Sequence, residues 1–322
     1  MDEFSFIDSI TQKYYRQSSL IKGIGDDAAV VRPVNGFDMI TASDTMVEGI
    51  HFRLTTMNPY HIGYRILGAN LSDLAAMGCD PAYYMVSIVI PKNWSQKQLE
   101  EVYSGMHDHA RQYQMDLIGG DTVSGNELVI TVTVYGYVPK NRSRYRSYAY
   151  EGDYIFVTGH LGDSAYGLHL LLEQKKAENR DYFIRRHQMP NPRVHFAQEL
   201  QSLKRLCLND VSDGIASEAN EIAQASRISL ELNYSAFPIR PEIKQYSLED
   251  QKKWVLSGGE DFELLGTVAK EDWVKVQAAA DKTNTKVTNI GVVKESRNNP
   301  QVLLIQSNGQ KEKLKRSGYV HL

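Results

Sequence analysis

Six short segments of the chain place a carboxylate beside glycine or a small polar residue, where an apolar run ends or a helical pattern begins. They occupy residues 23–27, 43–45, 71–73, 119–121, 210–214 and 257–261. Acidic side chains repel one another, so a fold gains nothing by gathering them unless a cation holds them together. Glycine lets the backbone approach a ligand closely. The pattern therefore indicates metal ions that carry a polyphosphate.

Length and charge limit the alternatives. A chain of 322 residues favours two domains over one large core. A formal net charge of -3 gives no basic field that would attract nucleic acid. The most apolar short stretch, residues 83–90, is too short to span a bilayer, and the acidic start of the chain is unlike a secretory signal. Cys79 and Cys207 look like reduced core thiols, so we expect a cytoplasmic protein.

Apolar periodicity divides the chain into two halves. In the first, residues 28–31, 37–42, 84–90 and 128–138 read as strands, and residues 59–77 and 95–113 as helices. A charged, turn-rich stretch follows, which we take as a linker over residues 139–152. We expect an N-terminal domain of residues 1–138 and a C-terminal domain of residues 153–322.

The second half mixes both kinds of element without a strict βαβ rhythm. Strands are expected at residues 153–158, 262–268, 287–293 and 302–305, and helices at residues 192–203, 215–226 and 270–283. The predicted fold is a two-domain α/β and α+β protein, with a sheet-and-helix N-terminal domain and a C-terminal α+β domain whose helices pack on a mixed sheet.

The familiar nucleotide-binding signatures are missing. The chain has no P-loop, protein-kinase or Rossmann pattern, so phosphate binding must rely on metals and backbone groups. The acidic segments contain no cysteine, and oxygen ligands suit Mg²⁺ or Mn²⁺ better than zinc. One such segment alone is most often a capped turn, but six together are much harder to dismiss. Four lie in the first half and two in the second, which predicts a site between the halves.

Asp73 lies three residues after Asn70, on the same face of an otherwise apolar helix. A carboxylate in such a setting needs a partner, which is either a cation or an arginine such as Arg53 or Arg65. Asp210 and Asp213 can both point into one turn toward cations, although Asp213 could instead cap the helix that follows.

Arg142, Arg144 and Arg146 form the only dense basic cluster. Such clusters are usually solvated, but without a P-loop lysine one arginine is a reasonable phosphate clamp. His51 is either structural or a ligand contact. No residue resembles an activated nucleophile. Phosphoryl transfer needs positioning and charge neutralisation more than covalent chemistry, and metals would supply most of both.

These segments resemble the thiamine-monophosphate kinase family, whose superfamily also holds aminoimidazole ribonucleotide synthetase and selenophosphate synthetase. The resemblance runs nearly end to end. It rests on Gly23-Ile24-Gly25-Asp26-Asp27, Asp44-Thr45-Met46-Val47-Glu48-Gly49-Ile50-His51-Phe52, Asn70-Leu71-Ser72-Asp73, Gly119-Gly120-Asp121-Thr122, Asp210-Val211-Ser212-Asp213-Gly214 and Ser257-Gly258-Gly259-Glu260-Asp261.

The resemblance implies an N-terminal half that dimerises through its sheet, and direct in-line transfer of the ATP γ-phosphoryl group to thiamine monophosphate with several Mg²⁺ ions. It implies catalytic roles for Asp44, Asp121 and Asp213. The metal ligands it implies are Asp27, Ala42, Ser43, Asp44, Asp73, Asp121, Asp210 and Asp213. Its ATP contacts would be Gly120, Asp121, Arg146, Ser212 and Tyr103, and its substrate contacts His51, Glu260 and Arg316.

The chain departs from the family pattern at two positions. The family often has serine or threonine where this chain has Ala42, so a metal contact there must use the backbone carbonyl. It often has tryptophan where this chain has Arg316, which cannot supply the same ring. Two other readings stay open: another ATP-dependent reaction of the superfamily, or a catalytically silent nucleotide-binding regulator.

Overall fold

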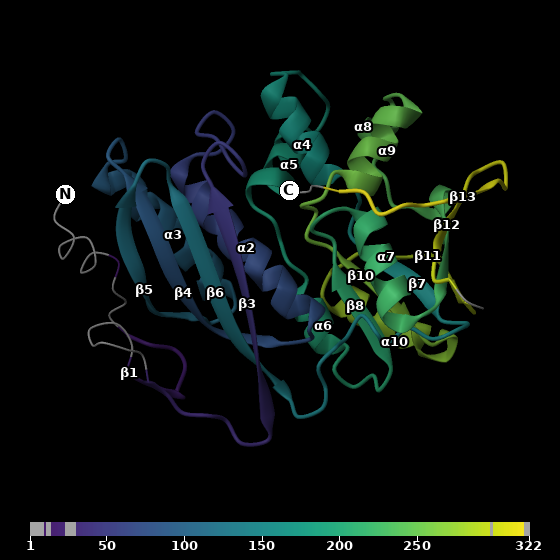
Figure 1. The fold of residues 1–322 in the computed structure, drawn as a ribbon, viewed down its shortest axis with the longest axis horizontal. Helices are drawn as coiled ribbons and strands as arrows, with labels where there is room; N and C mark the ends of the chain where they lie inside the picture. Colours follow the sequence, from purple (N-terminus) through teal and green to yellow (C-terminus); the bar gives the residue numbers. More distant parts are fainter. Residues whose placement is uncertain (1–9, 11–13, 23–29, 297–298, 319–322) are drawn as a thin grey trace. The chain divides into compact units, whose positions relative to one another are not determined.

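The computed structural model describes residue 10 and residues 14–22, 30–296 and 299–318 (Figure 1). The predicted segment at residues 23–27, and with it Asp27, lies outside the described residues. The chain folds into two compact units. The first unit comprises residues 1–74, 79–141 and 188–190, and the second comprises residues 75–78, 142–187 and 191–322.

The first unit is built on a four-stranded mixed sheet. Its strands run in the order β3 (Phe37–Val47), β6 (Val129–Pro139), β4 (Asp80–Pro91) and β5 (Asp116–Gly125). β4 and β5 pair in parallel, and the other pairs are antiparallel. Two short strands, β1 (Leu20–Lys22) and β2 (Val30–Val31), form a separate antiparallel pair.

Two helices, α2 (Pro59–Ala76) and α3 (Gln96–Gln112), cover one face of this sheet (Figure 1). Successive strand residues point to opposite faces, and along β6 every second residue is buried. Along β3 the alternate residues from Phe37 to Thr45 are exposed. The sheet therefore has one packed face and one open face.

The two helices approach closely because each has glycine where they meet. A Cβ atom on Gly63 of α2 would lie 1.7 Å from the Val102 carbonyl oxygen of α3, and one on Gly105 would lie 2.0 Å from the Tyr60 carbonyl oxygen. Both distances are far below van der Waals contact. Nearby, the rings of Tyr64 and His109 stack at 3.8 Å between centroids.

The ends of these helices follow local sequence signals. Ser95 caps α3 in a capping box with Gln98, as the expected helix start at Ser95 requires. α2 is followed by Gly78, whose φ of +71° suits glycine. The helices predicted at residues 59–77 and 95–113 are thus confirmed to within one residue.

The second unit contains a seven-stranded mixed sheet with helices packed on it. The strand order is β13 (Lys311–Lys313), β12 (Val302–Ile305), β9 (Ser229–Asn233), β11 (Val287–Lys294), β7 (Tyr154–Thr158), β10 (Leu264–Val268) and β8 (Leu206–Asp210). Only the β12–β9 pair is parallel among these described strands. The helices are α4 (Asp163–Leu172), α5 (Arg180–Gln188), α6 (Val194–Glu199), α7 (Ile215–Ser226), α8 (Pro241–Lys244), α9 (Leu248–Ser257) and α10 (Trp273–Lys282), with the 3-10 turns η1 (Tyr234–Ala236) and η2 (Lys270–Asp272).

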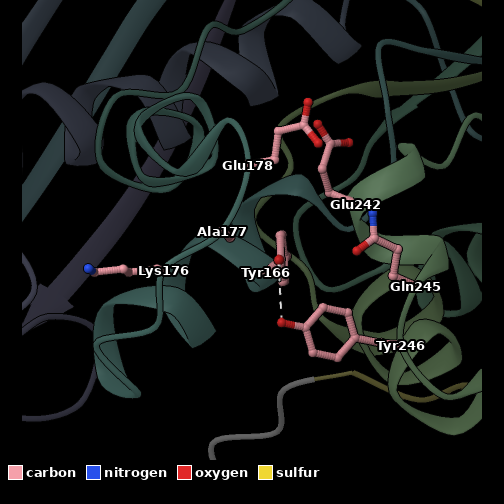
Figure 2. Close-up of a pocket in the computed structure, with 7 residues that line it drawn as sticks. All are labelled: Tyr166, Lys176, Ala177, Glu178, Glu242, Gln245 and Tyr246. Atoms are coloured by element: carbon pink, nitrogen blue, oxygen red, sulfur yellow. Dashed lines mark hydrogen bonds between the residues drawn. The ribbon is translucent and has the colours of Figure 1, made fainter.

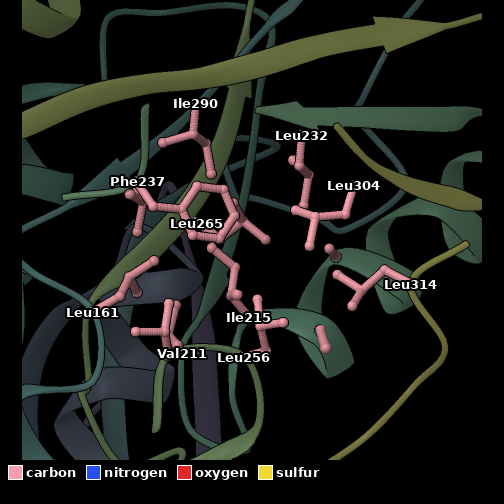
Figure 3. Packing of buried hydrophobic residues seen from close by; sticks show 14 of the residues in the cluster. Leu161, Val211, Ile215, Leu232, Phe237, Leu256, Leu265, Ile290, Leu304 and Leu314 are labelled. Atoms are coloured by element: carbon pink, nitrogen blue, oxygen red, sulfur yellow. The ribbon is translucent and has the colours of Figure 1, made fainter. Parts of the chain in front are cut away.

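The core of this unit lies between the sheet and its helices (Figure 3). Leu232, Leu265 and Ile290 from the strands meet Ile215 of α7 and Leu256 of α9, and all are buried. Leu314 from the C-terminal segment closes the same cluster. The prediction of helices on mixed sheets in two α+β units is confirmed. No helix among the described residues is long and apolar enough to cross a membrane.

Two acidic segments lie in strands instead of at the ends of elements. Residues 43–45 belong to β3, and residues 119–121 belong to β5, a strand that the sequence reading did not identify. A Cβ atom on Gly120 would lie 1.8 Å from the Val86 carbonyl oxygen of β4. The glycine that suggested a turn is required instead by the close approach of a neighbouring strand.

Candidate functional site

Asp44, Asn70 and Asp73 gather where β3 meets α2. Asn70 is fully buried, and its Oδ1 accepts a hydrogen bond from the Asp44 backbone N–H at 3.1 Å. Its Nδ2 donates to the Ile66 carbonyl oxygen at 2.9 Å. Asp73 is half-buried one helical turn after Asn70. The structure thus fixes the backbone of Asp44 against the helix that carries Asp73 and gives the Asn70 amide a positioning role.

Neighbouring β3 residues do not converge with Asp44. Ala42 and Asp44 lie on the helix-covered face, whereas the exposed Ser43 lies on the open face. Ser43 Oγ donates to the Val132 carbonyl oxygen at 3.2 Å and lies 3.0 Å from Thr133 Oγ1. The side chains of Ser43 and Asp44 therefore cannot ligate the same ion. Ala42 can contribute only its backbone carbonyl oxygen.

His51 lies in a tight loop directly after β3. The Val47 backbone N–H donates to His51 Nδ1 at 3.0 Å, and the His51 N–H donates back to the Val47 carbonyl oxygen at 2.9 Å. Because Nδ1 accepts a hydrogen bond, neutral His51 carries its proton on Nε2. Glu48 holds the loop, since its Oε2 accepts from Trp94 Nε1 at 3.1 Å. His51 is a positioned, half-buried donor.

Gly120 and Asp121 lie on β5, three strands away from β3. Across the sheet, Asp44 pairs with Val132 of β6, Val132 with Val86 of β4, and Val86 with Gly120 of β5. Asp121 lies one residue further along β5. Asp121 is exposed. Three strand spacings amount to roughly 14 Å, so Asp44 and Asp121 of one chain cannot share a single ion. Tyr103 is buried on α3, where burial raises the pKa of its hydroxyl.

The second unit contributes a pair of loops that are joined by backbone hydrogen bonds. The Glu260 N–H donates to the Ser212 carbonyl oxygen at 2.6 Å, and the Phe262 N–H donates to the Val211 carbonyl oxygen at 3.0 Å. Asp210, at the end of β8, is buried. Glu260 has a φ of +58°, an uncommon conformation outside glycine. The structure therefore holds Asp210, Ser212, Asp213 and Glu260 in adjacent loops.

Asp213 is not the N-cap of α7, because Gly214 occupies that position without a side-chain cap. A glycine is needed there: its φ is +117°, and a Cβ atom would lie 2.7 Å from the Leu256 carbonyl oxygen. The capping alternative for Asp213 is therefore wrong by one residue.

Glu218 is an acidic residue beside this loop that the sequence reading missed. It is buried, and its Oε1 accepts a hydrogen bond from the Asp213 N–H at 2.8 Å. Burial, together with the charges of Asp210 and Asp213, raises the pKa of Glu218 to about 9. Its Oε2 is buried and has no hydrogen-bond partner in the part of the chain described. The signal available in the sequence was a carboxylate placed among small and apolar residues of a predicted helix.

The donor set fits magnesium. The described residues hold no preformed group of three His, Cys, Asp or Glu side chains able to bind a metal. Mg²⁺ usually keeps several waters and is bound by one or two carboxylates together with substrate phosphates. Asp44 with Asp73 in the first unit, and Asp210 with Asp213 in the second, match that requirement. The unpaired Glu218 oxygen adds a further hard donor.

The three arginines of the basic cluster have different surroundings. Arg144 is buried, and its guanidinium donates to the carbonyl oxygens of Leu200 and Leu203, both at 2.8 Å. Burial lowers its pKa to about 10. Arg142 is exposed. Arg146 is also exposed, and its Nε donates to Asn209 Oδ1, beside Asp210 at the end of β8, at 2.8 Å.

Arg146 and Arg316 share one carboxylate. Arg146 Nη1 lies 3.4 Å from Glu221 Oε2, and Arg316 Nη2 lies 2.8 Å from Glu221 Oε1. Asn209 Nδ2 also donates to Glu221 Oε2, at 3.1 Å. The predicted ATP clamp and the predicted substrate contact thus meet on α7.

The acidic segment at residues 257–261 continues into a buried ion-pair network. Asp261 accepts hydrogen bonds from the N–H groups of Gly162 and Ser164 at the start of α4, at 2.7 and 3.0 Å. Burial raises its pKa to about 7. Glu263 is buried and binds Arg186 at 2.9 Å and Arg193 at 2.6 Å. These two carboxylates hold the loop that carries Glu260.

A separate cavity of about 230 Å³ lies between the α4–α5 connection and α8 (Figure 2). Its lining includes Tyr166, Glu178, Glu242 and Tyr246, with the two tyrosine hydroxyls 3.4 Å apart. None of the residues predicted for the site lines it.

Comparison with known proteins places both halves of the chain in one family. Residues 25–138 match the family model described as AIR synthase related protein, N-terminal domain, and residues 150–302 match its C-terminal domain. The chain is 44% identical over 326 residues to "Thiamine-monophosphate kinase" of Bacillus subtilis (strain 168), an alignment that covers 100% of this chain and 99% of that relative.

Solved structures give the same result. The thiamine-monophosphate kinase of Stenotrophomonas maltophilia K279a matches with a TM-score of 0.85 and 30% identity, covering 97% of this chain and 98% of that one. A structure described as AaThiL complexed with AMPPCP and TMP matches with a TM-score of 0.78 and 29% identity, covering 99% and 97% of the two chains.

Proposed function

The chain belongs to the thiamine-monophosphate kinase family, and we propose on this premise that it transfers the γ-phosphoryl group of ATP to thiamine monophosphate with Mg²⁺, giving thiamine diphosphate and ADP. The observation that carries the proposal is the hydrogen bond from the Asp44 backbone N–H to the buried amide of Asn70, one helical turn before Asp73, which fixes Asp44 of β3 against α2. The carboxylates of Asp44 and Asp73 offer hard oxygen donors.

The protein groups of both units would have a positioning role. Two anions, the γ-phosphate and the acceptor phosphate, must approach one another, and bound Mg²⁺ would neutralise their charges. Asp44, Asp73, Asp121, Asp210 and Asp213 would hold the ions. No covalent intermediate is needed, and the thiols are unsuited to one, because burial raises the pKa of both Cys79 and Cys207.

Five residues are proposed to contact the two substrates. Arg146 would bind the ATP phosphates as a planar guanidinium donor. Glu260 would orient the acceptor from its fixed loop. His51 would donate from Nε2 to the acceptor phosphate, since its Nδ1 already accepts the Val47 N–H. Gly120 and Ser212 are proposed as further ATP contacts.

We also propose that the open face of the four-stranded sheet pairs with a second copy of the chain. Met39 of β3 and Val123 of β5 are 58% and 47% exposed on this face, and threonines and tyrosines lie between them. A sheet face that carries exposed apolar side chains is a typical interaction surface. A cytoplasmic location is part of the proposal and is supported by the two buried free thiols.

The test is ADP release from ATP with thiamine monophosphate, thiamine or no acceptor, each with Mg²⁺ or with EDTA. We expect ADP only with thiamine monophosphate and Mg²⁺, in equal amount to thiamine diphosphate. If no ADP forms with either acceptor while ATP still binds tightly, the silent regulator is favoured. ADP formation without thiamine diphosphate would favour another reaction of the superfamily.

A further inference from the structure

Glu221 lies at the centre of a charged group on the outer side of α7. Its side chain is 21% exposed, and each carboxylate oxygen faces one guanidinium, Arg146 at Oε2 and Arg316 at Oε1. The two arginine side chains are 52% and 60% exposed. Two positive charges share one negative charge, so the group keeps a net positive charge that faces solvent.

Each guanidinium is also fixed by a second, neutral partner. Arg146 Nε donates to Asn209 Oδ1 at 2.8 Å, and Arg316 Nε donates to Ser217 Oγ at 3.2 Å. Among the described residues, Arg146 Nη2 and Arg316 Nη1 have no hydrogen-bond partner. Each arginine therefore keeps N–H donors that an anion can use.

The segment that carries Arg316 is anchored beside the acidic loop. A Cβ atom on Gly318 would lie 2.7 Å from the Asp213 carbonyl oxygen, and Ser317 Oγ lies 2.8 Å from Ser257 Oγ. Arg316 thus reaches α7 from a segment in contact with both loops of the site. The backbone beside Arg316 is anchored and its guanidinium is already hydrogen-bonded, so this long side chain loses less entropy when an anion binds.

We infer that Glu221 is a positioning residue that couples Arg316 to Arg146, so that Arg316 belongs to the nucleotide-phosphate clamp and not to the thiamine acceptor site. The inference rests on the proposed function and deepens it. It assigns a role to a residue, Arg316, that replaces an aromatic side chain common in the family. Exposed salt bridges contribute little to stability. If the Glu221 ion pairs had only a structural role, removing them would leave the affinity for ATP almost unchanged.

The experiment compares Glu221→Gln, Glu221→Asp, Arg316→Ala and the double variant Glu221→Gln/Arg316→Ala with the wild-type chain. Arg142→Ala removes an exposed arginine of the same cluster and is the matched control. Steady-state kinetics give the KM for ATP, the KM for thiamine monophosphate and kcat. Calorimetry with a non-hydrolysable ATP analogue gives a Kd that does not depend on turnover.

We expect Glu221→Gln and Arg316→Ala each to raise the KM for ATP and the analogue Kd about five- to tenfold, the loss typical of one charge-assisted hydrogen bond. The KM for thiamine monophosphate and kcat should stay within about twofold, because neither residue contacts the acceptor. The double variant should bind ATP no worse than about the weaker single variant, since Glu221 acts by holding Arg316 beside Arg146 and has nothing to couple once Arg316 is removed. Glu221→Asp should recover part of the affinity.

Two results would overturn the inference. If Arg316→Ala raises only the KM for thiamine monophosphate, Arg316 contacts the acceptor. If all variants bind the ATP analogue as Arg142→Ala does, the contacts are ordinary surface ion pairs. A wild-type chain that binds the analogue but forms no thiamine diphosphate would refute the proposed function, and the analogue Kd values would still decide the role of Glu221.

Discussion

The buried amide of Asn70 accepts a hydrogen bond from the backbone N–H of Asp44 at 3.1 Å, which fixes a strand residue from the neighbouring helix. Its amide nitrogen is held in turn by the Ile66 carbonyl oxygen. The carboxylate of Asp44 is therefore placed by a side chain that need not contact any substrate.

Asn70→Leu should lower the free energy of unfolding by about 1–3 kcal/mol, because the Asp44 N–H and the Ile66 carbonyl lose a partner. Turnover should fall about tenfold or more as Asp44 loses its fixed position. Ser72→Ala is the control on the same helix, since Ser72 Oγ is buried without a hydrogen-bond partner among the described residues. Urea unfolding and kcat check both effects. Wild-type kcat in Asn70→Leu would refute the positioning role.

Asp44→Asn and Asp121→Asn should each reduce turnover by about 10²–10³ while the fold stays intact, because electrostatic positioning of the phosphates is lost. Asp38→Asn removes a carboxylate from the same strand, where Asp38 Oδ2 accepts from the Asn141 N–H at 3.0 Å, and should keep its activity. Circular dichroism and steady-state kinetics provide the comparison. Normal turnover in either site variant would contradict the proposed metal-assisted reaction.

Gly63→Ala should destabilise the first unit by at least about 2 kcal/mol, because the new Cβ atom would lie 1.7 Å from the Val102 carbonyl oxygen and would force α2 and α3 apart. Ser104→Ala, at an exposed position on α3, should change stability by less than about 0.5 kcal/mol. Denaturant midpoints measure the difference. Equal stability of the two variants would mean that the helices do not cross at these glycines.

His109 should make stability depend on pH. Burial lowers the pKa of His109 from 6.5 to about 4, so the unfolded chain binds its proton first as the pH falls. The free energy of unfolding should be highest above pH 6.5 and should decrease by up to about 3 kcal/mol toward pH 4. His109→Asn should flatten this slope, and His107→Gln, at a 44% exposed position on the same helix, should keep it. Urea titrations between pH 4 and 8 measure the slopes.

Thr133→Arg tests pairing through the open sheet face. Thr133 lies on this face beside Ser43, and a twofold pair would bring two added charges together. We expect the variant to elute as a monomer at concentrations where the wild-type chain is a dimer. Val274→Arg, at a position 70% exposed on α10, should leave the dimer intact. Light scattering after size-exclusion chromatography checks the masses, and a monomeric wild type would refute the proposed pairing.

Local signals in the sequence determined several elements directly. Ser95 and Gln98 form the capping box that starts α3, and the expected strand at residues 302–305 is β12. Such features depend on residues a few positions apart, so they can be read along the chain. The role of a glycine was harder to predict from the sequence. Gly120 allows two strands to pack closely, whereas the sequence pattern indicated a turn.

Only the tertiary structure shows which residues of a charged cluster face the candidate site. Arg142, Arg144 and Arg146 are equivalent in the sequence, yet Arg144 is buried against backbone carbonyls and Arg146 meets Glu221. Asp261 and Glu263 likewise hold the loop of Glu260 through residues far away in the chain. The sequence by itself determined which chemistry is available: it supplies carboxylates beside glycines, and no residue that resembles an activated nucleophile. The roles of individual side chains depend on long-range interactions and burial, which only folding creates.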